Sequence, residues 1–121
     1  MDAERLFTYT QRLVIERLRK DLSRRILRPI TVMYWAPSDR LVGIASFCIE
    51  GTGRDAGPLA SILTGPGIAG EGYAVDAGDG SPLAEGVSFA HAEQVARLAA
   101  LYARRNSATP QRRALTPGNG D

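Results

Sequence analysis

The sequence predicts an α+β domain in which a β-hairpin, or a small sheet of up to three strands, packs with two long amphipathic helices. Two runs rich in β-branched and aromatic residues, 30–36 and 41–49, predict the hairpin. Apolar residues that recur every three or four positions predict helices over residues 2–28 and 87–105. Helical and strand periods in one short chain indicate an α+β architecture.

Both faces of the predicted hairpin are largely apolar. If Ala36 pairs with Leu41, the register puts Tyr34 opposite Gly43. A solvated face would carry charged or amide groups at alternate positions, so we expect both faces to be covered. The face with Gly43 and Ala45, whose small size lets a helix come close, is expected to form the main core.

The second hairpin face is predicted to contact a protein partner or a second copy of the chain. If nothing covered it, a contiguous apolar patch would remain, and soluble monomers seldom expose such a patch without using it. Trp35 is the expected anchor, because aromatic residues dominate binding energy at interface centres. The alternative is that the C-terminal helix covers this face and makes Trp35 part of the core. The predicted contact residues are Met33, Trp35, Val42 and Ile44.

Charge is distributed unevenly along the chain. Residues 1–28 carry a net charge of +4, residues 29–96 carry −6 and residues 97–121 carry +4, which leaves +2 overall. Either the basic ends dock on the acidic middle, or they present a positive surface to an external anion. We rank docking first, because nucleic-acid-binding domains are usually more strongly basic. The candidate contacts to an anionic partner are Arg12, Arg17, Arg24, Arg112 and Arg113.

Residues 51–86 are rich in turn-forming residues, with ten glycines and three prolines. We expect one helical turn over 59–63, a short third strand over 72–76, and helix starts at Pro58 and Pro82. The pattern Gly51-Thr52-Gly53 follows a strand but lacks the long helix of a dinucleotide site. Residues 76–81 resemble a calcium loop only superficially, since glycines occupy ligand positions.

The C-terminal helix is predicted to begin after a Ser88 cap. It is predicted to pack through a stripe of Val87, His91, Gln94, Val95, Leu98, Leu101 and Tyr102. Residues 107–121 carry too little apolar surface to order themselves, so they are predicted to form a disordered tail. The expected organisation is a single domain over residues 1–106, followed by this tail.

The inventory of reactive residues argues against an enzyme. Cys48 lies in the middle of a strand among apolar residues, and His91, on an apolar helix side, is expected to be a core histidine. One histidine and one cysteine provide too few ligands for a usual transition-metal site. A site built only of carboxylates stays open. We therefore expect no catalytic residue, no metal and no cofactor.

No apolar run approaches the length that spans a bilayer, and the N-terminus lacks a signal-peptide pattern, so a cytoplasmic protein is expected. The bias toward arginine and alanine indicates a bacterial or phage origin. The predicted function is a protein-binding or regulatory module that acts by occupying a macromolecular partner. The alternative is a small nucleic-acid-binding protein that uses its arginine-rich first helix.

Overall fold

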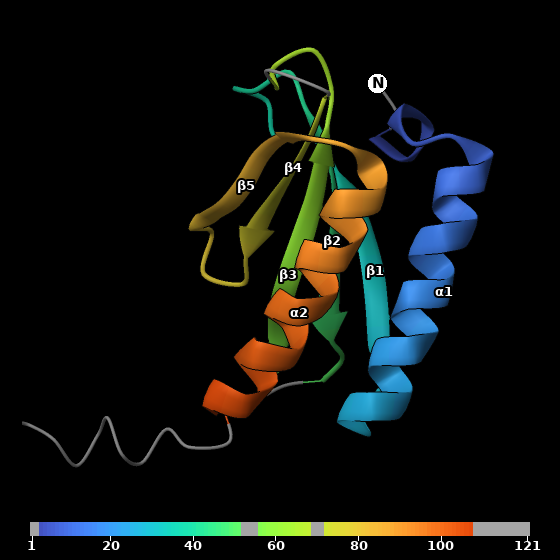
Figure 1. Cartoon of the computed structure of the whole chain (residues 1–121), viewed down its shortest axis with the longest axis vertical. Coiled ribbons are helices and arrows are strands. Elements are labelled where there is room, and N and C mark those ends of the chain that lie inside the picture. The colour runs from blue at the N-terminus through green and yellow to red at the C-terminus, as the bar shows by residue number, and fades with distance from the viewer. Residues whose placement is uncertain (1–2, 52–55, 69–71, 108–121) are drawn as a thin grey trace, which may run out of the picture.

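The computed structural model describes residues 3–51, 56–68 and 72–107. It confirms the α+β class, with two long helices and a five-stranded antiparallel sheet instead of two or three strands (Figure 1). The sheet is a meander in which each strand pairs with the next along the chain. Nearly all of the predicted tail, from residue 108 on, lies outside the described residues. In chain order the elements are η1 (Ala3–Leu6), α1 (Tyr9–Ile26), β1 (Ile30–Trp35), β2 (Gly43–Ile49), β3 (Gly57–Thr64), β4 (Tyr73–Ala77), β5 (Pro82–Val87) and α2 (Phe89–Ser107).

Strands β3 and β5 occupy the two segments for which short helices were predicted, at Pro58 and at Pro82. Residues 59–63 lie in β3, the central strand, whose last six residues are buried. A strand covered on both faces has no alternating polar positions, so its sequence does not show the usual strand pattern. Pro82 begins the edge strand β5, a position that tolerates proline, and does not open a helix. The strand predicted over 72–76 is present as β4, but it is the fourth strand and pairs with β3 and β5 instead of lying beside the hairpin.

The hairpin of β1 and β2 keeps its predicted faces in a different register. Tyr34 pairs with Ala45, not Gly43, because β2 begins only at Gly43 and the connection is longer than predicted. A shift of two residues leaves each side chain on the same face, since side chains alternate with a period of two. Gly43 lies against η1, where an added Cβ would come within 2.6 Å of Leu6 Cδ1.

Helix α1 begins later than predicted because Thr8 caps it. The Thr8 hydroxyl accepts a hydrogen bond from the Gln11 backbone N–H, and the Gln11 side chain accepts one from the Thr8 N–H. The helix ends after Ile26, where Leu27 takes the left-handed conformation with φ of 64°. Its buried residues, Ile15, Leu18, Leu22 and Ile26, form the apolar stripe that the sequence indicates.

Helix α2 packs mainly through alanines, so the predicted packing stripe is only partly right. Ala92, Ala96 and Ala100 are fully buried. They are spaced four residues apart on one side, and their small side chains leave room for Phe47 and Ile62 from the sheet. Of the predicted stripe, Val87, Val95 and Leu101 pack partly against the core, while its other members face outward. The exposed residues among them are His91, Gln94, Leu98 and Tyr102.

The main core lies between one face of the sheet and the two helices. In Figure 1, α2 crosses in front of the central strands and α1 runs alongside β1. Arg97 of α2 joins the two helices through an ion pair with Asp21 of α1 at 2.5 Å. It also pairs with Glu93 of its own helix at 2.5 Å. Both long helices thus belong to one layer, and the other face of the sheet carries neither of them.

Candidate functional site: the open face of the sheet

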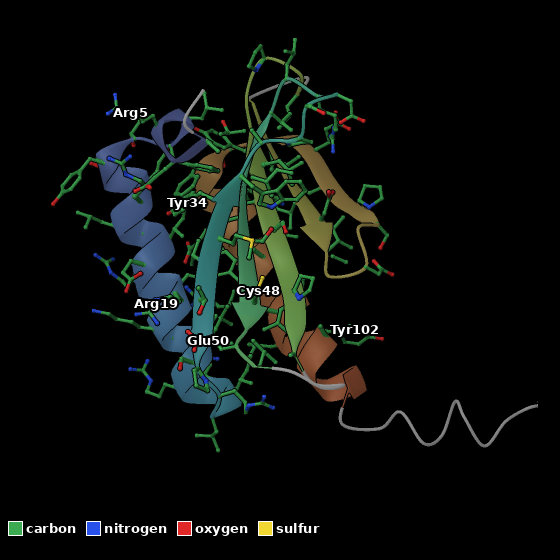
Figure 2. The ribbon with its side chains drawn as sticks, turned by 180° about the vertical axis from the view of Figure 1, so that it is seen from behind. Arg5, Arg19, Tyr34, Cys48, Glu50 and Tyr102 are labelled. Atoms are coloured by element: carbon green, nitrogen blue, oxygen red, sulfur yellow. The ribbon has the colours of Figure 1, made fainter. Side chains whose placement is uncertain are left out.

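We call the side of the sheet turned away from both helices the open face. Figure 2 shows it toward the viewer, with Cys48 near its centre and α2 behind the strands. It is built by the strand positions that alternate with the core positions, as the pairing register fixes. Its residues are Thr31, Met33, Trp35, Ile44, Ser46, Cys48, Ser61, Leu63, Ala74 and Asp76.

Two of the four predicted contact residues are accessible on this face. Met33 is 55% exposed and Trp35 is 45% exposed. Val42 and Ile44 are buried, because they pack with Ile68 and other residues in a small second cluster at one end of the face. Val42 also lies before β2 rather than within it. The predicted alternative, a C-terminal helix over Trp35, is wrong because α2 packs on the opposite face.

A row of polar side chains crosses the open face beside Trp35. Ser46, Ser61 and Asp76 are direct cross-strand neighbours on β2, β3 and β4, and Met33 continues the row on β1. The Trp35 indole N–H donates to the Ser46 hydroxyl at 3.1 Å, and the Ser46 and Ser61 hydroxyls are 2.8 Å apart. These hydrogen bonds satisfy two buried hydroxyls and hold the indole ring against the sheet.

The polar row borders an open hollow of about 350 Å³, whose lining includes Trp35, Arg40, Ser61 and Asp76. Burial raises the pKa of the Asp76 carboxyl, the charge of Arg40 partly opposes this, and the charge of Glu85 adds to it. No hydrogen bond to the Asp76 side chain is present within the described part of the chain. The hollow therefore combines an aromatic edge, neutral hydroxyls and one carboxylate that is costly to ionise.

The chain's single cysteine and single histidine, which a thiol nucleophile and its base would require, lie on different sides of the sheet. Cys48 is half-buried on the open face, and burial raises the pKa of its thiol. His91 is exposed on α2, across the sheet, so the expectation of a core histidine is wrong. Within the described residues, no three His, Cys, Asp or Glu side chains gather as metal ligands. The geometry pairs neither residue with a catalytic partner.

The arginines predicted to bind an anion do not form one patch. Arg12 donates to the Glu4 carbonyl at 3.2 Å, and Arg24 pairs with Asp21 at 2.8 Å. Arg17 is exposed, and the helical period places it near Arg24 but more than 100° from Arg12. Arg112 and Arg113 lie outside the described residues. Two of the three described arginines therefore bind the chain itself.

Sequence reasoning missed a second surface, an apolar groove beside α2. The groove has a volume of about 730 Å³ and lies between α2 and the region where β3, β4 and β5 meet. Leu83, Leu98 and Tyr102 border it and are exposed. The outward-facing α2 residues were assigned to the core, so the sequence pattern gave no sign of a groove there.

No family model, curated protein or solved structure matches this chain. No helix within the described ranges is long and apolar enough to cross a membrane. The case for function therefore rests on the geometry of this molecule.

Proposed function

We propose that the protein is a non-enzymatic binding or regulatory module that occupies a protein partner through its open face. The observation that carries the proposal is the pair Met33 and Trp35, which stay about half exposed on the sheet face that bears neither long helix. Large apolar side chains gathered on one face are typical of protein contact surfaces.

The chemistry around Trp35 supports this function. Trp35 is fixed by its hydrogen bond to Ser46, so little side-chain entropy is lost on binding. Aromatic anchors next to neutral polar groups are typical of interface centres. Asp76 adds one carboxylate at the far end of the polar row, which favours a partner with a basic or hydrogen-bond-donating group there.

A photo-crosslinking amino acid at position 33 tests the proposal in the source cells. We expect adducts with a protein target that form from position 33 and are lost when Trp35→Ala is added. The matched control is the same crosslinker at Leu98, which is 67% exposed on α2. Adducts formed equally from both positions, or from Leu98 alone, would contradict the proposal.

Binding of nucleic acid by α1 stays the second candidate, because the helix holds six basic and two acidic residues. Such binding is driven by release of counterions from phosphates and weakens steeply as salt rises. Ion pairs within the chain reduce the available charge, since Asp21 engages Arg24, Arg25 and Arg97. This candidate therefore ranks behind protein binding.

A further inference from the structure

The two edges of the sheet differ in how well they could accept another strand. The edge strand β5 begins with Pro82, and its pairing with β4 is interrupted by two register shifts. Prolines and bulges are devices that keep an edge from pairing. Strand β1 has neither: its six residues hold no proline, glycine or charge, and each pairs with β2 in an unbroken register.

Part of the β1 backbone turns its hydrogen-bonding groups outward, and those of Val32 and Tyr34 meet no partner among the described residues. The Glu50 N–H donates to the Pro29 carbonyl at 3.0 Å, which makes this a hydrogen-bonded pair of the ladder. Hydrogen-bonded pairs alternate along an antiparallel ladder, so Thr31, Met33 and Trp35 bond to β2. The N–H and C=O groups of Val32 and Tyr34 therefore point outward.

The Ile30 carbonyl confirms this outward direction, because it accepts a hydrogen bond from Arg19 Nη1 of α1 at 3.1 Å. Helix α1 partly shields this edge but does not fill it. A groove of about 350 Å³ lies between them, lined by Glu16 and Arg19 on one side and by Val32 and Tyr34 on the other. Figure 1 shows α1 running alongside β1 over its length.

We propose that the outer edge of β1 accepts an extended segment of the protein partner as a sixth strand, in the groove between α1 and β1. The proposal deepens the proposed function and rests on it. In such β-augmentation, backbone hydrogen bonds supply affinity and alternate side chains supply specificity. Residues of the segment opposite Val32 and Tyr34 point into the groove, and the residue opposite Met33 lies on the open face.

The charges around the groove specify the segment further. Glu16 forms hydrogen bonds with Arg19, and the Glu50 charge also acts on Arg19. The Lys20 charge acts on Glu16, so two carboxylates and two cations meet here. Figure 2 shows Arg19 and Glu50 at the same end of the strand. The charges at this end balance, so the segment needs no charged side chain opposite Thr31. The open-face position beside Met33 favours an apolar side chain.

A matched pair of variants isolates the backbone contribution. Val32→Pro removes an N–H that β2 does not use, and proline is tolerated where the N–H of an edge strand faces outward. Val32→Ala removes most of the side chain and keeps the N–H. The probe is a phage-displayed library of random linear peptides selected on the full chain. We expect enriched peptides with alternating apolar residues.

Binding of an enriched synthetic peptide should weaken about fivefold in Val32→Pro, the equivalent of about 1 kcal/mol for one lost backbone hydrogen bond, and little in Val32→Ala. Thermal melting checks that both variants fold. If Val32→Pro does not fold, N-methylation of alternate peptide amides replaces it, and only one set of positions should abolish binding.

The outcomes separate this inference from the function on which it rests. If Trp35→Ala weakens peptide binding and Val32→Pro behaves like Val32→Ala, strand addition is overturned and the open face stands as the contact surface. If neither Trp35→Ala nor Val32→Pro changes binding, both proposals fail. Failure to enrich any peptide that prefers the wild-type chain over Val32→Pro also overturns strand addition.

Discussion

Replacing Trp35 with alanine should cost moderate stability and most of the binding. A fully buried tryptophan replaced by alanine costs about 3–5 kcal/mol. Because Trp35 is 45% exposed, slightly more than half of its side chain contributes, which gives about 2 kcal/mol. The lost hydrogen bond adds little, since the Ser46 hydroxyl keeps its contact with Ser61. In a domain of this size, 2 kcal/mol lowers the melting temperature by about 8 °C.

Thermal and urea unfolding of Trp35→Ala measure this loss directly. Phe47→Ala provides the comparison, because Phe47 is fully buried in the main core and should lose about 4 kcal/mol. If Trp35→Ala loses as much stability as Phe47→Ala, the indole belongs to a core. The reasoning that assigns it to a contact surface would then be refuted.

Three further predictions concern charge. Asp21→Asn should destabilise the fold by about 2 kcal/mol at neutral pH, because a part-buried carboxylate loses charged partners on both helices. Burial would raise the pKa of Asp21, but the charges of Arg25 and Arg97 and the hydrogen bond from Arg24 outweigh it and lower the pKa. The stability difference in urea should therefore be present above the ordinary carboxyl pKa and vanish as pH falls through the lowered value. Asp76→Asn should do the opposite: the raised pKa means that wild-type stability falls as pH rises through the carboxyl range, so the variant should melt higher at neutral pH and equally in acid. If α1 binds duplex DNA, the affinity should fall with salt at a log–log slope near −0.9 per phosphate, and charge reversal of its exposed arginines should flatten that slope; no binding at about 50 mM salt would remove this candidate.

The two faces of the hairpin could be predicted from the sequence, but the strand that pairs beside it, β3, could not. Side chains alternate with a period of two, so Met33 and Trp35 share one face whatever the register. The shifted pairing with β2 therefore did not change which residues share that face. The central strand β3 could not be recognised from the sequence, because burial on both faces removes the alternation of polar and apolar residues that marks a strand.

The packing side of α2 was partly missed for a physical reason of its own. Large apolar residues usually mark the core side of a helix, but the fully buried positions of α2 are alanines, because the helix lies close to the sheet. Leu98 and Tyr102 were therefore assigned to the core although they border an exposed groove.

The polar row of the open face depends on contacts that no local pattern encodes. Ser46, Ser61 and Asp76 come from three strands and become neighbours only through the register of the whole sheet. The sequence could supply Trp35 as an anchor, but not the hydroxyls that orient it. Nor could it show that Val42 and Ile44 are covered by a loop residue, Ile68.

The most direct test of the open face as the contact surface is a paired affinity measurement by calorimetry on the crosslinked target. Trp35→Ala and Leu98→Ala each remove an exposed apolar side chain, the first from the open face and the second from the groove beside α2. The account predicts that Trp35→Ala weakens binding at least about tenfold, the scale of an interface anchor, and that Leu98→Ala leaves binding unchanged. Unchanged affinity in Trp35→Ala with a loss in Leu98→Ala would contradict it and move the contact surface to α2.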